Sequence, residues 1–170
     1  MDLKLEGKKA FISGSTQGIG FAIAKQLLNE KAQVIINGRN EEKTNLAIMK
    51  LQDEFPNAKV SGIATDFSNK EEVENLLSQL KDIDILINNV GVFELKAFED
   101  IKDEDWYRIF EINVMSSIRL SKKVLPQMLQ KKTGRILFIS SESGVNIPEN
   151  MIHYGMTKAA MMAVSNGLSK

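Results

Sequence analysis

Tyr154 and Lys158 lie four positions apart near the end of the chain, in the sequence Tyr-Gly-Met-Thr-Lys. On a helix this spacing places both side chains on one face. A phenol keeps its proton at neutral pH, and a neighbouring ammonium favours the phenolate form. The pair is therefore a candidate proton donor for reducing a carbonyl, or proton acceptor for oxidising an alcohol. Because Tyr and Lys also meet at helical spacing by chance, other motifs must decide whether the pair is catalytic or structural.

A glycine-rich turn precedes the first expected helix, with the sequence Gly-Ser-Thr-Gln-Gly-Ile-Gly at positions 14–20. Glycines permit a tight turn and a close approach of the backbone to a diphosphate, and the following helix offers N–H groups and partial positive charge. The spacing G-x-x-x-G-x-G differs from the standard fingerprint G-x-G-x-x-G, and an ordinary strand–helix turn is the alternative. The strand–turn–helix context favours a dinucleotide site. The residues expected to contact the dinucleotide here are Gly14, Ser15, Gln17, Gly18, Ile19 and Gly20.

The second expected strand ends in Asn-Gly-Arg-Asn, in which the arginine is Arg39. An acidic residue at this end would bind the ribose hydroxyl groups of NAD, whereas an arginine accommodates the 2′-phosphate of NADP. No carboxylate lies between the end of this strand and Glu41, so the sequence favours NADP over NAD as the cofactor. The alternative is a solvated arginine in a turn.

Polar residues follow the next three expected strands. Asp66 follows the third strand, Asn89 and Gly91 close the fourth, and Ser141 ends the fifth, thirteen positions before Tyr154. Side-chain amides at strand ends tie adjacent loops together, so Asn89 is expected to be structural, in contact with the cofactor, or both. A serine at a strand end is usually a turn residue, but the loop after Ser141 is long enough to bring its hydroxyl group to that of Tyr154.

Short apolar runs alternate with helical patterns, which is typical of strand–helix units around a parallel sheet. Right-handed crossovers make such a chain wind outwards on both sides of its first strand, which predicts a doubly wound, Rossmann-like α/β fold of strand order 3-2-1-4-5. The motifs above then meet at the carboxyl ends of the strands. The expected strands are residues 9–13, 33–37, 59–64, 83–88 and 135–140. The expected helices are residues 18–30, 41–54, 70–79, 103–129 and 154 onwards.

The helical patterns carry three further expectations. Asn113 lies inside the fourth helix, where asparagine is a mediocre helix former, and it is either exposed or faces the crevice, distorts the helix and holds a water. Pro126 falls late in the same helix and is expected to bend or end it. In the first helix the 3.6-residue period predicts an apolar face, with one polar interruption, made of Ile19, Ala22, Ile23, Gln26 and Leu27.

Length and composition bound the class of protein. The 170 residues suffice for one domain, expected to be a dinucleotide-binding domain over residues 1–170. Basic and acidic residues balance at 22 each, so neither nucleic acid nor a membrane is expected as a partner. The absence of cysteine and the single histidine exclude disulfides, thiolate catalysis and histidine-rich metal sites. No apolar run approaches the roughly 18 residues of a spanning helix, and the polar start is unlike a signal peptide, so a cytoplasmic protein is expected.

Taken together, these residues resemble those of the classical short-chain dehydrogenases/reductases, in one consistent order along the whole chain. The resemblance implies hydride exchange between C4 of a nicotinamide and the carbon of a small-molecule carbonyl or secondary alcohol. It implies that Tyr154 exchanges the proton, while Lys158 favours the ionised phenol and binds the nicotinamide ribose. It further implies that Ser141 orients the substrate oxygen and that Asn113 holds a water that connects Lys158 to solvent.

The resemblance also assigns the contacts to the cofactor. In similar members of the family the residues equivalent to Asp66 and Asn89 flank the adenosine part, next to the motif that ends in Gly91. Arg39 resembles the basic residue of members that prefer NADP. No metal enters the chemistry that the resemblance implies.

The chain ends soon after the Tyr/Lys pattern, whereas members of this family usually continue with further strands, helices and a substrate lid. The strand at residues 136–139 would then be a sheet edge with unpaired N–H and C=O groups, which invites pairing with another chain. We therefore expect either a fragment of a longer protein or a homo-oligomer, as a dimer or tetramer, that covers this edge. Two functions follow from the sequence: an NADP-dependent oxidoreductase, or a truncated, catalytically silent nucleotide-binding or interaction module.

Overall fold

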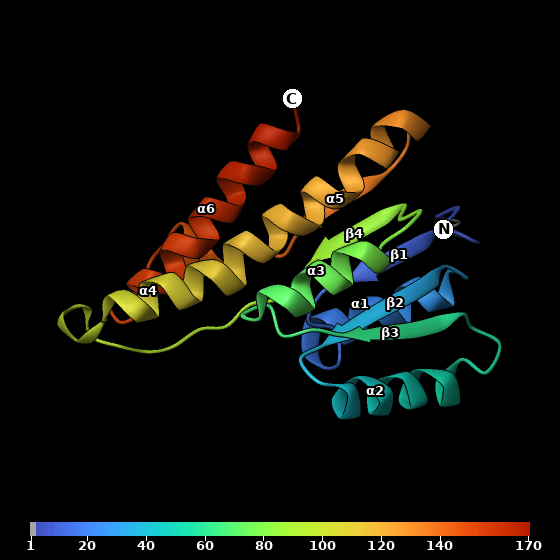
Figure 1. The fold of residues 1–170 in the computed structure, drawn as a ribbon, viewed down its shortest axis with the longest axis horizontal. Coiled ribbons are helices and arrows are strands. Elements are labelled where there is room, and N and C mark those ends of the chain that lie inside the picture. The colour runs from blue at the N-terminus through green and yellow to red at the C-terminus, as the bar shows by residue number, and fades with distance from the viewer. Residues whose placement is uncertain (1–2) are drawn as a thin grey trace.

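The computed structural model describes residues 3–170 and contains a five-stranded parallel sheet in the order β3-β2-β1-β4-β5 (Figure 1). This order confirms the doubly wound α/β fold expected from the sequence. Because the winding direction reverses between β1 and β4, the crevice of the sheet lies at their carboxyl ends. The strands are β1 (Lys9–Ile12), β2 (Gln33–Gly38), β3 (Val60–Ala64), β4 (Ile85–Asn88) and β5 (Arg135–Phe138).

Helices follow each of the strands. In Figure 1 the helices α4 and α5 form one long rod, and α6 runs beside it. The α-helices are α1 (Gly18–Asn29), α2 (Glu41–Glu54), α3 (Lys70–Gln79), α4 (Asp103–Phe110), α5 (Ser116–Lys131) and α6 (Ile152–Leu168). Shorter turns are the 3₁₀ turns η1 (Phe98–Asp100) and η3 (Glu142–Gly144) and the π turn η2 (Glu111–Met115).

The core lies on both faces of the sheet, because successive side chains of a strand point to opposite faces. Ala10 and Ile12 of β1 belong to the buried cluster that includes Leu51 of α2. Phe11, between them, belongs to the second cluster, which includes Leu120 of α5. All of these side chains are fully buried. The short apolar runs in the sequence therefore reflect a sheet that is covered by helices on both faces.

Side-chain caps explain where α2 and α3 begin. Asn40 precedes α2 and its side chain accepts a hydrogen bond from the backbone N–H of Lys43. Asn69 precedes α3 and its side chain accepts from the N–H groups of Glu71 and Glu72. These caps satisfy N–H groups that have no partner inside the helix, and the acidic residues of both first turns favour the helix dipole.

The buried face of α1 agrees only in part with the one expected, since Ile23 and Leu27 pack against the core but are not its most buried positions. The structure buries the positions of Gly20, Ala24 and Leu28, whereas Ile19 is 63% exposed. Gly20 has to lie against the segment after β4, since a Cβ at this position would be 2.5 Å from the side chain of Asn89. The positions of Gly20, Ala24 and Leu28 are therefore the most buried, and Ile19, the neighbour of Gly20, points in another direction.

The long fourth helix also differs from its expected course. Pro126 lies inside α5 and does not end it, since the helix continues to Lys131. The buried residues Val124 and Met128, on either side of the proline, anchor α5 on the sheet. Proline removes one backbone hydrogen bond and adds a steric clash, and we attribute the persistence of the helix to this packing.

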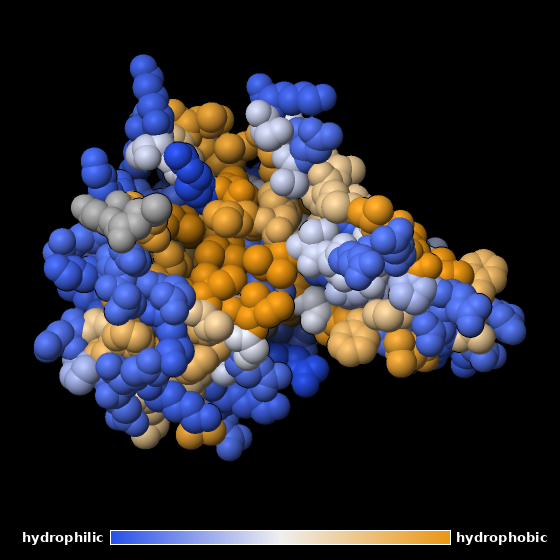
Figure 2. Space-filling model, turned by 180° about the vertical axis from the view of Figure 1, so that it is seen from behind, coloured by the Kyte–Doolittle hydropathy of each residue, from blue (hydrophilic) through white to orange (hydrophobic). Residues whose placement is uncertain are grey.

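The strand β5 forms an edge of the sheet in the described residues, where it pairs with β4. Leu137 of β5 is 45% exposed. Figure 2 shows a large apolar area on the side of the molecule that faces away from the viewer in Figure 1. Within residues 3–170, every helix is too short or too polar to span a bilayer.

Candidate active site

The glycine turn joins β1 to α1 and has no room for a side chain at two of its glycines. A Cβ on Gly14 would lie 2.9 Å from the Cα of Val90, and a Cβ on Gly20 would lie 2.5 Å from Nδ2 of Asn89. Gly18 has a φ of +61°, where glycine is favoured, and a Cβ there would meet nothing within 4 Å. The turn is thus packed against the end of β4 and open beside Gly18. This shape fits the close approach of a diphosphate to the backbone.

The N-terminus of α1 differs from those of α2 and α3 in its capping. Gln17, the N-cap residue, makes no side-chain capping hydrogen bond, and the first turn of α1 contains no acidic residue. The first N–H groups of a helix have no partner inside the helix and carry partial positive charge. An uncapped N-terminus beside a glycine turn therefore suits the negative charge of a dinucleotide.

Two side chains fix the glycine turn to the end of β4. The hydroxyl group of Ser13 accepts hydrogen bonds from the N–H groups of Asn89 at 2.9 Å and Val90 at 3.0 Å. The Nδ2 group of Asn89 donates to the carbonyl oxygens of Ser13 at 3.0 Å and Gly14 at 2.7 Å. Asn89 thus has a structural contact, one of the roles expected for it, and its side-chain amide holds the shape of the turn.

Asn37 makes an equivalent connection on the other side of the turn, and the sequence analysis did not single it out. Its Oδ1 atom accepts from the N–H of Gly14 at 2.9 Å, and its Nδ2 group donates to the carbonyl oxygen of Ile63 at 2.9 Å. The Ser15 hydroxyl, expected near the cofactor, is buried and bonds the N–H of Asn37 and the carbonyl of Ile12. The signal in the sequence was the position of Asn37 at the end of β2, directly opposite the turn.

A cleft of about 440 Å³ extends from the glycine turn across the ends of β2 and β3 to the segment after β4. It contains five of the residues expected to bind the cofactor: Gly14, Gln17, Arg39, Asp66 and Gly91. It is also lined by polar residues that the sequence analysis missed: Thr16, Lys43, Ser68 and Arg108. The other residues expected to bind the cofactor are not part of its lining: Ser15, Gly18, Ile19, Gly20, Asn89, Tyr154 and Lys158. The cleft has the position that a doubly wound sheet gives to a nucleotide.

Arg39 and Asp66 face one another across the ends of β2 and β3. Burial raises the pKa of the Asp66 carboxyl, but two hydrogen bonds from Ser68 and the charge of Arg39 outweigh it, so the pKa lies below its ordinary value. The bonds from the N–H and the hydroxyl of Ser68 measure 2.9 and 2.7 Å. Asp66 is therefore ionised at neutral pH, and on this side of the cleft it accompanies the basic side chains of Arg39 and Lys43.

Tyr154 and Lys158 lie on α6, as the helical spacing predicts. Lys158 is 3% exposed, and its Nζ atom donates to the carbonyl oxygen of Ile139 at 2.8 Å. The same atom lies 5.6 Å from the centroid of the Tyr154 ring, and 3.6 Å from the position that a Cβ on Gly91 would occupy. Burial lowers the pKa of the Lys158 ammonium. Tyr154 and Lys158 are thus neighbours, and the Lys158 ammonium lies beside Gly91, in the segment after β4 that lines the cleft.

Asn113 is buried in the π turn between α4 and α5, which excludes the exposed position and supports the distorted helix. Its Oδ1 atom accepts from the N–H of Val92 at 2.8 Å, and its Nδ2 group donates to the carbonyl oxygen of Val92 at 2.9 Å. The Nδ2 group also donates to the hydroxyl group of Thr157 at 3.0 Å. Thr157, which the sequence analysis missed, in turn donates to the carbonyl oxygen of Tyr154 at 2.7 Å. Asn113 thus links the segment after β4 to the helix that carries Tyr154.

Ser141 lies at the start of η3, in the loop between β5 and α6. Its hydroxyl oxygen accepts a hydrogen bond from the N–H of Ser143 at 3.1 Å, so its own proton is free for another acceptor. The loop packs closely on α6 at Gly155, where a Cβ would lie 2.6 Å from both the carbonyl oxygen of Ser143 and a side-chain carbon of Ile147. This contact brings the end of β5 next to the turn of α6 that carries Tyr154.

His153, beside Tyr154, is fully buried and faces α4. Its ring meets that of Trp106 edge to face, with 5.9 Å between the centroids. This placement agrees with the rule that consecutive helix positions point apart. Among residues 3–170 there is no group of three or more His, Asp or Glu side chains placed to hold a metal ion.

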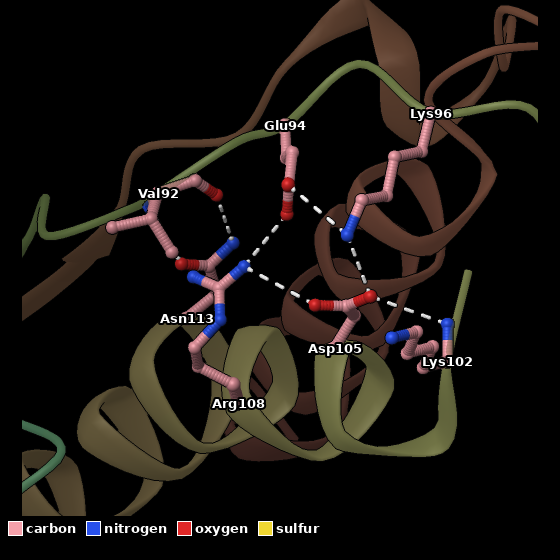
Figure 3. Close-up of polar contacts among 7 residues, drawn as sticks. All are labelled: Val92, Glu94, Lys96, Lys102, Asp105, Arg108 and Asn113. Carbon is pink, nitrogen blue, oxygen red and sulfur yellow. Dashed lines mark hydrogen bonds and ion pairs between the residues drawn. The ribbon is translucent and has the colours of Figure 1, made fainter. Parts of the chain in front are cut away.

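The segment at residues 92–97, which we call the strap, leaves β4 and is held to α4 by ion pairs (Figure 3). Glu94 accepts from the guanidinium of Arg108 at 2.7 Å, and Lys96 donates to Asp105 at 2.7 Å. The Lys96 ammonium also lies 3.2 Å from Glu94. The hydrogen bond from Lys96, followed by that from the N–H of Lys102, lowers the pKa of the Asp105 carboxyl. The charged side chains of the strap, Glu94 and Lys96, are thus both paired with charged side chains of α4.

Comparisons with known proteins define the family. The short chain dehydrogenase model matches residues 8–170. The chain is 42% identical over its full length to the uncharacterized oxidoreductase YvaG of Bacillus subtilis, of which it covers 64%. Over 98% of its length it is 36% identical to the 3-oxoacyl-[acyl-carrier-protein] reductase FabG of Haemophilus influenzae, of which it covers 68%. The chain belongs to the short-chain dehydrogenase family.

A solved structure agrees with this assignment. L-sorbose reductase from Gluconobacter frateurii, in complex with NADPH and L-sorbose, superposes with a TM-score of 0.92 at 31% sequence identity. The match covers 99% of this chain and 65% of that protein. The chain thus spans slightly less than two thirds of the length of this reductase and of YvaG.

The lowered pKa of Asp105 predicts how stability depends on pH. A carboxyl whose pKa is lower in the folded state stabilises the fold above its unfolded pKa of about 3.9, and this contribution is lost as the pH falls through the folded pKa. Asp105→Asn should therefore lower the urea midpoint at pH 7, and the difference from the unmodified protein should disappear at acidic pH.

The matched control is Glu104→Gln, which removes a neighbouring carboxylate from the same first turn of α4. It should leave the midpoint at pH 7 nearly unchanged, because surface charges without close partners contribute little. A difference for Asp105→Asn that stays constant between neutral and strongly acidic pH would show that the ion pair with Lys96 is not its cause.

Proposed function

We propose that the protein is an oxidoreductase that interconverts a carbonyl and a secondary alcohol with NADP(H), and that Tyr154 exchanges the proton. The observation that carries this proposal is the position of Tyr154 and the buried Lys158 next to Gly91, where the cleft from the glycine turn ends. Membership of an oxidoreductase family supports the class of reaction. The domain that performs it is proposed to be a single dinucleotide-binding domain over residues 1–170.

The residues that would hold the cofactor lie along the cleft. The glycine turn would bind the diphosphate through backbone N–H groups at the N-terminus of α1, since Gly18 leaves the approach open. Arg39 would bind the 2′-phosphate of NADP, with Asp66 and Asn89 on the adenosine side. Lys158 would bind the nicotinamide ribose. When bound, the reduced nicotinamide supplies the hydride that is added to the carbonyl carbon. The NADPH in the related L-sorbose reductase supports this choice.

Tyr154 and Lys158, in the first two turns of α6, would transfer and stabilise the proton. In reduction the Tyr154 hydroxyl donates its proton to the carbonyl oxygen as the carbon gains a hydride, so that one alcohol forms for each carbonyl consumed. The ammonium of Lys158, 5.6 Å from the Tyr154 ring, favours the phenolate that this transfer leaves. The phenolate then regains a proton from solvent, which completes the cycle. In oxidation the same groups act in reverse.

Ser141 and Asn113 would position these groups. The Ser141 hydroxyl already accepts one hydrogen bond, from Ser143, and can donate its proton to the substrate oxygen. The Asn113 Oδ1 atom accepts one hydrogen bond, from Val92, and an amide oxygen has a second lone pair. That lone pair is proposed to hold a water that connects Lys158 to solvent.

The protein is proposed to act on a small molecule, without a metal and without a nucleic acid or membrane partner. It is further proposed to work in the cytoplasm as a homo-oligomer. The substrate is a small carbonyl compound or secondary alcohol.

Replacement of the proposed proton donor tests the reaction. Tyr154→Phe removes the hydroxyl and keeps the ring, so NADPH consumption with a panel of carbonyl compounds should fall at least about 100-fold, the contribution of a general acid. NADPH affinity, measured by fluorescence titration, should change by less than a few-fold. Tyr107→Phe, on the exposed surface of α4, is the matched control and should keep full turnover. Near-normal turnover of Tyr154→Phe would remove Tyr154 from the mechanism.

Replacement of Arg39 tests the choice of cofactor. Arg39→Leu removes a cation from the cleft and should weaken NADPH binding roughly tenfold, which corresponds to one lost charged hydrogen bond, while NADH binding stays within about twofold. Isothermal titration with both cofactors measures this ratio. Arg135→Leu, an exposed arginine on β5, controls for the general loss of positive charge. An equal loss for NADPH and NADH would show that Arg39 does not read the 2′-phosphate.

A further inference from the structure

The strap at residues 92–97 exposes apolar side chains and hides charged ones, the reverse of an ordinary surface segment. Glu94 and Lys96 point to α4 and have side chains that are 35% and 28% exposed. Phe93 and Leu95, which alternate with them, are 66% and 60% exposed. Side chains of an extended segment alternate between its two sides, so the strap has a charged inner side and an apolar outer side.

The inner side is fixed from three directions. Val92 is held by both atoms of the Asn113 amide, and Lys96 is paired with Asp105 at 2.7 Å. The N–H of Lys96 also donates to the carbonyl oxygen of Asn150 at 2.9 Å, which joins the strap to the loop between β5 and α6. The backbone of the strap is therefore held on both sides of Phe93, at Val92 and at Lys96.

The outer side faces the proposed proton donor. The Phe93 ring meets the Tyr154 ring at an interplanar angle of 64°, with 6.1 Å between the centroids. The loop that the strap bonds carries two further exposed apolar side chains, Val145 at 72% and Ile147 at 45%. Ile147 lies over Gly155, the residue after Tyr154. Exposed apolar side chains that gather beside a reactive group mark a binding surface.

The charges of the strap and of the loop beside it disfavour an anionic substituent next to Phe93. The strap cation Lys96 is turned to α4 and paired with Asp105 and Glu94. The loop beside the strap carries exposed carboxylates at Glu142 and Glu149. A carboxylate or phosphate bound beside Phe93 would therefore lose water without gaining a cation from the strap.

We infer that Phe93 selects the substrate, and that it favours carbonyl compounds with an uncharged, apolar substituent, alkyl or aryl, over those that carry a carboxylate. This inference rests on the proposed function, since it takes the carbonyl to lie at the hydroxyl of Tyr154. The ring that meets Tyr154 then forms the wall against which the substituent of the carbonyl packs.

Two ligands that share a methyl ketone test this preference. Methyl butyl ketone and levulinate differ in that the first ends in an ethyl group where the second ends in a carboxylate. Their dissociation constants are measured on the full chain by ligand-observed NMR titration, with NADP⁺ present so that no ketone is reduced. The unmodified protein should bind methyl butyl ketone at least about tenfold more tightly, because the carboxylate has to give up its water and the strap offers it no cation in return.

Variants locate the preference at Phe93. Phe93→Ala should weaken the binding of methyl butyl ketone at least about fivefold and that of levulinate less than twofold, because it removes apolar contact alone. Phe93→Leu keeps an apolar side chain and should retain most of the affinity. Phe98→Ala is the matched control: Phe98 is 62% exposed, but its ring meets Trp106 and not Tyr154, so neither constant should change.

The outcomes separate this inference from the proposed function. Equal affinities for the two ligands, no binding of either, or an equal loss of both in Phe93→Ala would overturn the role of Phe93, even if NADPH is consumed with a ketone. A preference for methyl butyl ketone that Phe93→Ala removes, in a protein that consumes no NADPH with any carbonyl, would overturn the reaction but leave Phe93 as part of a ketone-binding surface.

Discussion

The side-chain amide of Asn113 is the interaction on which the candidate site depends. It bonds both backbone groups of Val92, at 2.8 and 2.9 Å, and the hydroxyl of Thr157 at 3.0 Å. An amide offers donors and an acceptor together, which few side chains do, and here it is buried, where an unmade bond costs about 1–3 kcal/mol. The π turn places the amide at this point, so the irregularity of the long helix serves to connect the strap with α6.

The bonds of Asn113, together with those around the glycine turn, explain how distant parts of the chain form one site. The sheet sets the positions of the glycine turn and the end of β4, and the side chains of Ser13, Asn37 and Asn89 lock them together without adding charge. Asn113 then fixes α6 relative to the end of β4. With both connections made, the cleft extends from an uncapped helix N-terminus to Gly91, which lies beside the buried ammonium of Lys158. This arrangement suits a dinucleotide in shape and charge.

Sequence alone predicted those features that depend on local pattern. The strand order follows from alternating apolar runs, and the Tyr154/Lys158 pair follows from helical spacing. What the sequence left open depends on long-range contacts. The period of α1 pointed to Ile19, but the contact of Gly20 with the end of β4 decided the buried face. Asn113 had two possible environments. Asn37 could be noticed only by its position at the end of β2, and Thr157 and the ion pairs of the strap had no local signature, because their partners lie elsewhere in the chain.

Hydrogen exchange of the Val92 amide tests most directly whether Asn113 holds the strap to α6. In the unmodified protein this N–H, which bonds the Asn113 side chain, should be protected from exchange. Asn113→Ala should remove most of that protection. The amide of Val34 in β2, which donates to the carbonyl oxygen of Lys59 before β3, should keep its own protection. Unchanged protection of Val92 in this variant would contradict the account, because the amide would then be held by something other than Asn113.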